Sequence, residues 1–184
     1  MRSMLKLSAF APLAVAVALA APAQAKNPMV GGAPMYESKT IVENAVNSKV
    51  HTTLVAAVKA AGLVETLSGP GPFTVFAPTN AAFAKLPPGT VDNLVKPENK
   101  ATLTKVLTYH VVPGNYSSAD LSALAKKSGG QAELKTAQGE TLAVIVKGQN
   151  LYVADAKGNT ARVTTSNVKQ SNGVIHVVDK VMMP

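Results

Sequence analysis

The hydrophobic period of this chain changes once, at a glycine pair at 129–130, and this change limits the fold more than any other feature. Before the pair, apolar residues recur at helical spacing, as they do between Leu103 and Leu107. After it, apolar and polar residues alternate, as in the segment 131–135, which is typical of a strand with one buried face. A helix-rich first half followed by a strand-rich second half predicts an α+β domain.

Turn and cap residues divide both halves into short elements. A Gly-Pro-Gly-Pro string at 69–72 ends a pair of opening helices and leads into a short buried strand at 73–77. The segment 174–178 is apolar on both alternating faces, which predicts a central strand covered on each side. The other expected helix starts are Thr40, Thr79 or Asn80, Pro97, and Ser117 or Ser118, and the expected strand turns are 138–139, 148–149 and 155–159.

The first 25 residues have the form of a secretory signal peptide. Arg2 and Lys6 precede an apolar run that is too short to span a bilayer, and residues 23–25 have the small-x-small pattern that a signal peptidase cuts. We expect cleavage near Ala25, no transmembrane segment after cleavage, and a periplasmic or secreted product. Residues 26–38 are expected to form an irregular Gly/Pro/Met leader, and residues 39–184 a single domain.

Composition narrows the range of partners. The chain has no cysteine, so neither a disulfide nor a thiolate metal site can form. The formal net charge is +8, but Arg162 is the one arginine outside the predicted signal peptide. Proteins that read nucleic acids usually rely on arginine and stacked aromatics, so no nucleic-acid partner is expected. The lysines suit either solubility or attraction to anionic envelope polymers, and composition leaves both open.

No arrangement of residues indicates catalysis or a cofactor. His51, His110 and His176 form no close pair, and the sequence contains no nucleophile elbow, zinc-protease motif or phosphate-binding loop. We therefore predict no catalytic residues, no cofactor and no metal site. Four methionines near the ends of the mature chain could supply soft ligands for Cu(I) if they converged, but core packing is the favoured interpretation; they are Met29, Met35, Met182 and Met183.

Three segments together resemble the fasciclin domain family. The segments FTVFAPTNAAF at 73–83 and NGVIHVVDKVMMP at 172–184 resemble its two signature segments, and LTYHVVPG at 107–114 resembles its Tyr-His segment. The resemblance implies a wedge-shaped β-sandwich flanked by several short helices, with the signature segments as adjacent central strands. The matching residues are Phe73, Thr74, Phe76, Pro78, Thr79, Asn80, Phe83, His110, Asn172, Gly173, His176 and Asp179.

The resemblance also implies a class of function. Members of this family serve mainly as adhesion or matrix-contact modules, which implies a non-catalytic exported module that contacts a cell-surface or matrix protein or polysaccharide. The alternative is a carrier of an apolar small molecule, because a few fasciclin proteins bind carotenoids. An open groove lined by apolar side chains would favour that alternative.

Candidate binding residues follow from the same comparison of motifs. Tyr109 belongs to the Tyr-His segment, where its ring could anchor an interface or cover the core. Asn167 and Val168 occupy the positions of an Asp-Ile pair that engages integrins in animal relatives. Because Asn167 lacks the carboxylate that an integrin-bound metal ion requires, integrin binding is not expected. His110 and His176 are predicted to be buried structural residues.

Overall fold

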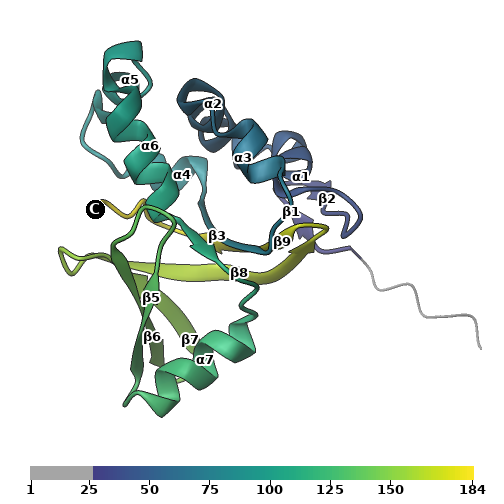
Figure 1. Ribbon diagram of the computed structural model, residues 1–184, viewed down its shortest axis with the longest axis vertical. Coiled ribbons are helices and arrows are strands. Elements are labelled where there is room, and N and C mark those ends of the chain that lie inside the picture. The colour runs from purple at the N-terminus through teal and green to yellow at the C-terminus, as the bar shows by residue number, and fades with distance from the viewer. Residues whose placement is uncertain (1–26) are drawn as a thin grey trace, which may run out of the picture.

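The computed structural model describes residues 27–184, and a single seven-stranded sheet organises them (Figure 1). The strand order is β4-β3-β9-β8-β7-β6-β5. The helices are α1 (Ile41–Asn47), α2 (Thr52–Ala61), α3 (Val64–Ser68), α4 (Asn80–Ala84), α5 (Thr90–Leu94), the 3-10 helix η1 (Pro97–Asn99), α6 (Lys100–Tyr109) and α7 (Ser118–Lys127). The strands are β1 (Met29–Val30), β2 (Ala33–Pro34), β3 (Phe73–Pro78), β4 (Val111–Pro113), β5 (Gln131–Lys135), β6 (Thr141–Lys147), β7 (Asn150–Ala154), β8 (Thr160–Gln170) and β9 (Gly173–Val178).

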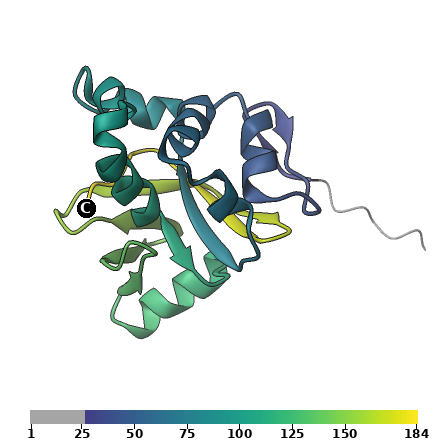
Figure 2. The same cartoon turned by 45° about the horizontal axis from the view of Figure 1, so that its top comes forward.

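The sheet bends so that its two halves face each other as a sandwich. The long strand β8 pairs with β9 along one part and with β7 along another, and its register with β9 shifts twice between Val163 and Val168. Such bulges increase local twist and bend a strand. Figures 1 and 2 both show α1 to α6 on one side of β3 and β9, with α7 and the strands β5 to β7 on the other. This arrangement confirms the predicted α+β fold with helices flanking a sandwich.

Two apolar cores fill the two sides of the central strands. The helix-side core lies between α1–α6 and the face of the sheet that carries Val75 and Ile175. The strand-side core lies between the opposite face, which carries Phe76 and Val178, and the strands β5–β7 with α7. All six residues of β9 are buried, which confirms the central strand expected from its apolar pattern.

The two signature segments lie side by side. Strand β3 pairs with β9 in parallel, from Phe73 opposite Gly173 to Pro78 opposite Val178. Every other pairing in the seven-stranded sheet is antiparallel. Parallel strands need a crossover connection, and here residues 79–172, from α4 to β8, form that connection.

The helix caps agree with the sequence pattern. Thr79 accepts a hydrogen bond from Ala82 N at the start of α4. Ser117 and Asp120 form a reciprocal capping box at the start of α7. No helix in residues 27–184 is both long and apolar enough to cross a membrane.

The leader at 26–38 is more ordered than the sequence interpretation expected. Its strands β1 and β2 form a hairpin whose turn residues, Gly31 and Gly32, both have positive φ. Two adjacent glycines favour this turn, but strands of two residues are too short to show a period. Val30 and Met35 are buried in the helix-side core, so part of this segment belongs to the domain. The predicted signal peptide lies outside the described residues.

Three further elements were not predicted: the third opening helix, α5 and β4. Helix α5 (Thr90–Leu94) follows Gly89 and is only five residues long, so it shows no helical period. The opening helical region contains three helices, because Gly62 adopts a left-handed conformation that ends α2 before α3 begins. The edge strand β4 has three residues and follows α6 directly, so it also shows no period.

Replacing Gly173 by alanine should destabilise the protein strongly. A Cβ atom at Gly173 would lie 2.0 Å from the Phe73 carbonyl oxygen, so β3 and β9 would have to separate. We expect a loss of about 2–4 kcal/mol in the free energy of unfolding, measured by urea denaturation. Gly148→Ala is the control, since its Cβ meets nothing within 4 Å and only its φ of 62° is unfavourable; it should cost about 1–2 kcal/mol. Equal losses for the two variants would contradict this account of the strand contact.

Candidate functional site

His110 joins α6 to the C-terminal segment from inside the core. Its Nε2 lies 3.0 Å from Met182 N, and its Nδ1 lies 2.8 Å from the Val106 carbonyl oxygen. Because a backbone N–H can only donate, Nε2 accepts and the proton lies on Nδ1, which donates to Val106. Burial lowers the pKa of His110 to about 4, so the ring is neutral at pH 7. The expected burial is confirmed, since only 3% of the residue is exposed.

Tyr109 is completely buried in the strand-side core. Its hydroxyl donates to the Thr141 carbonyl oxygen at 2.9 Å and accepts from Ala156 N at 3.1 Å. Burial raises the pKa of the Tyr109 hydroxyl, which therefore stays protonated at neutral pH. The ring links α6 to β6 and to the turn after β7, and no partner can touch it while the domain is folded.

His176 connects β9 to the bulge in β8. Its Nδ1 accepts a long hydrogen bond of 3.4 Å from Asn167 N, so Nε2 carries the proton and donates to the Tyr116 carbonyl oxygen at 2.8 Å. The ring is fully buried, and it stacks on Phe76 with 5.6 Å between ring centroids. Burial lowers the pKa of His176 and favours this neutral form.

Asn167 and Val168 both make contacts within the fold, but Asn167 is exposed and Val168 is buried. Asn167 has a φ of 59°, a left-handed conformation that asparagine tolerates better than most residues. Its side chain accepts from Ser118 N and donates to Ser118 Oγ, both at 2.7 Å, which fixes the first turn of α7. Val168 is fully buried in the helix-side core, so its side chain is not available to a partner.

Two signature asparagines cross-link segments that are distant in sequence. Asn172 accepts from Ile41 N at 3.1 Å and donates to the carbonyl oxygens of Leu67 and Gly69 at 2.7 and 3.0 Å. It thereby joins α1, the end of α3 and the start of β9. Asn80 joins the start of α4 to the start of α2. Its side chain accepts from Thr53 N at 3.0 Å and donates to the Lys49 carbonyl oxygen at 3.0 Å.

The other signature residues are also used internally. Thr74 donates to the Gly114 carbonyl oxygen at 2.7 Å and accepts from Tyr116 N at 2.9 Å. Asp179 accepts from Arg162 N at 2.8 Å, which ties the end of β9 to β8. The apolar members of the signature, Phe73, Phe76, Pro78 and Phe83, pack in or against the two cores. The signature is therefore a set of internal contacts, and it contains no exposed reactive group.

The methionines do not converge on one point. Met35 is buried in the helix-side core and Met182 in the strand-side core, on opposite faces of the sheet. Met29 is 63% exposed. The geometry required for a four-sulfur Cu(I) site is therefore absent, and this hypothesis was wrong. Residues 27–184 also contain no group of three or more His, Cys, Asp or Glu side chains placed to hold a metal ion.

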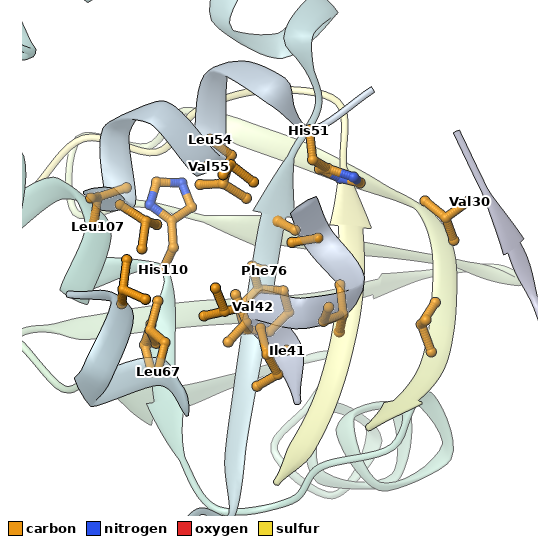
Figure 3. Close-up of a pocket in the computed structure, with 18 of the residues that line it drawn as sticks. Val30, Ile41, Val42, His51, Leu54, Val55, Leu67, Phe76, Leu107 and His110 are labelled. Atoms are coloured by element: carbon orange, nitrogen blue, oxygen red, sulfur yellow. The ribbon is translucent and has the colours of Figure 1, made fainter. Parts of the chain in front are cut away.

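An apolar cavity of about 40 Å³ lies within the helix-side core (Figure 3). Its walls come from α1, α2, α3 and α6 and from the strands beneath them. Sites for drug-sized ligands usually measure about 300–1,000 Å³. The cavity has too little room for a long polyene, so it gives no support to the carotenoid-carrier alternative.

A second hollow is open to solvent where the two edges of the sheet approach each other. It measures about 400 Å³ and lies between β4 and the turn that joins β5 to β6. The hydrogen bond from Ala137 N to the Val111 carbonyl oxygen, 2.7 Å long, closes its floor. We call this hollow the edge groove; it is lined by Val112, Pro113, Tyr116, Lys135, Thr136, Ala137 and Gly139.

Sequence reasoning missed the edge groove. The groove forms from segments about 20 residues apart that are joined only through the folded sheet; Val112 and Pro113 belong to the Tyr-His segment, and the other lining residues belong to no motif. The half-buried aromatic residue Tyr116 and the exposed Lys135 are the one signal that could have indicated the groove.

These features define a fasciclin fold whose signature residues are structural. The chain belongs to the fasciclin domain family: residues 49–184 match the family model described as Fasciclin domain. It is 48% identical to protein sll1483 of Synechocystis sp. over 86% of this chain and 81% of that protein. It is 35% identical to the cell surface glycolipoprotein MPB83 of Mycobacterium bovis, over 87% of this chain and 68% of that protein.

A solved structure shares the same fold. The FAS1 domain pair of the insect cell adhesion molecule fasciclin I matches with a TM-score of 0.71, covering 79% of this chain and 51% of that one. The sequence identity is 18%, so this likeness concerns the fold alone.

Replacing His110 by alanine should destabilise the domain without any specific loss of binding. The change removes a buried ring and leaves Met182 N and the Val106 carbonyl without their partner. We expect a loss of about 2–4 kcal/mol in chemical denaturation. His110→Gln is the matched control, since an amide can both donate and accept, and it should lose less. An alanine variant with the midpoint of the wild type would show that His110 is not a structural residue.

The protein should lose stability as the pH falls from 6.5 toward 4. The pKa of His110 is about 4 in the folded chain and about 6.5 when unfolded, so the unfolded state binds more protons in this window. At pH 5 this single residue should reduce the free energy of unfolding by about 2 kcal/mol relative to pH 7.5. His51 and His176 shift in the same direction and add to the loss.

Urea denaturation of the wild type and His110→Gln at both pH values isolates the contribution of His110. The difference in the free energy of unfolding between the wild type and His110→Gln should be smaller at pH 5 than at pH 7.5, because glutamine does not titrate. An unchanged difference would contradict the assignment of the neutral ring.

Proposed function

We propose that this chain is an exported, non-catalytic module that binds a polysaccharide or protein of the cell surface or matrix through the edge groove. One observation carries the proposal. The polar groups of the family signature are consumed by internal hydrogen bonds, whereas the edge groove is a concave surface of about 400 Å³ that stays open to solvent.

The chemistry of the edge groove suits a sugar or a peptide chain. Tyr116 is half-buried and offers an aromatic ring, and exposed Lys135 offers a charged donor. Apolar and polar groups share the lining, as in surfaces that combine stacking with hydrogen bonds. Pro113 in the edge strand β4 lacks an N–H, which disfavours strand addition there and favours recognition by side chains.

Charge supports a partner that is at least partly anionic. The chain has 18 Lys and Arg against 10 Asp and Glu. Within residues 27–184 the one ion pair joins Lys85 to Asp179, at 3.8 Å. Lysines that are not neutralised by carboxylates attract anionic polymers and speed their encounter with the protein.

The expected location of this chain and the name of a relative also support the proposal. The N-terminal sequence has the pattern of a signal peptide, which is consistent with a periplasmic or secreted product. A relative that matches most of this chain is named as a cell surface protein. The described residues contain no group of three or more His, Cys, Asp or Glu side chains placed to hold a metal ion, and the proposal is a binding role instead of catalysis.

Filling the edge groove should abolish binding. Ala137 is exposed on the β5–β6 turn, and Ala137→Trp would place an indole across the groove. Against immobilised alginate, dextran and a cell-envelope fraction, we expect the wild type to bind the envelope fraction and the variant to bind at least about tenfold more weakly.

The control is Ala60→Trp, the same substitution at an exposed position of α2 in the helical layer. It should bind as the wild type does. Equal binding by both tryptophan variants would remove the edge groove from the proposal, and no binding by the wild type to any envelope component would overturn the proposed function itself.

A further inference from the structure

The apolar cavity in the helix-side core carries one histidine at each end. Figure 3 shows His51 at the end near Val30 and His110 at the end near Leu107. The rest of the lining is apolar side chains from α1, α2, α3, α6 and the strands beneath them. The two rings differ in one respect: both nitrogens of His110 have partners, and one nitrogen of His51 does not.

The unpartnered atom is Nε2 of His51. The residue is only 3% exposed, and its Nδ1 lies 2.9 Å from Ser48 Oγ. We assign the Ser48 hydroxyl as the donor to Nδ1, which places the ring proton on Nε2. Burial lowers the pKa of His51 and keeps the ring neutral; the Ala77 carbonyl acts in the opposite direction but makes no hydrogen bond of normal geometry.

A buried donor without an acceptor is costly. It loses its hydrogen bond to water and gains nothing in exchange, which destabilises the fold. A buried water molecule is poorly suited to accept this hydrogen bond, because a buried water needs two to four polar partners and the lining of the cavity is almost entirely apolar. A molecule with a single acceptor atom and an apolar body matches this lining better.

The cavity can be reached from solvent between the first three helices. Four of its lining residues are half-buried instead of buried, and they mark the side on which the wall is thin: Val42 and Ala45 of α1, Val55 of α2 and Val64 of α3. The other side of the cavity is the sheet, where Val75 and Ile175 are buried.

We propose that this cavity binds one small apolar molecule whose single polar atom accepts a hydrogen bond from His51 Nε2. A short ketone, aldehyde or alcohol has this chemistry. A carboxylate does not, because its charge would be buried without a cation. The size of the cavity, about 40 Å³, restricts the ligand to a few carbon atoms. This site is separate from the edge groove and stands whether or not the edge groove binds a partner.

Two probes of nearly the same shape test the hydrogen bond. In 2-butanone the polar atom is a carbonyl oxygen, and in 2-methyl-1-butene a CH2 group replaces it. Titrated into the ¹⁵N-labelled protein, 2-butanone should shift the amide signals of α1, α2 and β3 and the His51 Nε2 signal in a saturable way. The ratio of its affinity to that of the alkene should be at least about fivefold higher in the wild type than in His51→Leu, because only the wild type can donate a hydrogen bond to the ketone.

Two variants complete the test. In His51→Leu the ketone should lose affinity relative to the alkene, since the remaining histidine, His110, already has partners for both ring nitrogens. Val55 is half-buried in the cavity wall between α1 and α2, and in Val55→Phe the larger side chain reduces the space in the cavity. Both probes should therefore bind this variant more weakly while the fold is kept. Ala137→Trp should bind 2-butanone as the wild type does.

Shifts that fail to saturate, or that spread evenly over the protein, would overturn the proposal. A ketone-to-alkene affinity ratio that is the same in the wild type and in His51→Leu would also overturn it. If His51→Leu does not fold, a His51 Nε2 signal that does not shift with 2-butanone in the wild type overturns the proposal.

Discussion

The parallel contact between β3 and β9 is the constraint on which the rest of this structure depends. The strands are about 100 residues apart in sequence, and their backbones meet so closely that two glycines are required. A Cβ atom at Gly71 would lie 2.0 Å from the Asn172 carbonyl oxygen, and one at Gly173 would lie 2.0 Å from that of Phe73. Both faces of β9 are then buried, so each face needs its own cover. The helices cover one face, and the bent second half of the sheet covers the other.

This constraint explains why the family signature is found in these strands. Asn172, Asn80 and Thr74 satisfy buried or partly buried backbone groups where a helix or loop approaches the central strands. A polar residue of this kind is fixed by the fold and tells little about a ligand. In this family, recognition of the fold and identification of the partner therefore depend on different residues. The partner is expected to contact surfaces such as the edge groove, which the signature does not include.

Much of the fold could be predicted from the sequence because its signals are local. Alternation predicted the strands after Gly130, and Thr79 and Ser117 act as helix caps as expected. The hairpin of the leader and the strand β4 were missed, since elements of two or three residues show no period. The site was less predictable. The bulge in β8 turns Asn167 toward α7, and no pattern of alternation contains that shift. The unpaired nitrogen of His51 depends on where Ser48 and Ala77 lie in space, which the sequence does not reveal.

The position of β9 also determines how the domain carries mechanical load. The turn before β9 is tied to the N-terminal side of the domain through Ser171, whose N–H donates to Lys39, and the segment after it runs to the C-terminus. Figure 1 shows the first described residues and the C-terminus on opposite sides of the molecule. Tension between the two sides is directed along β9, so it acts in shear against both neighbouring strands, β3 and β8. The hydrogen bonds of the β3–β9 and β8–β9 ladders therefore resist the tension together instead of opening one after another. A module that holds an exported protein to a surface would thus fail by sliding of a whole strand.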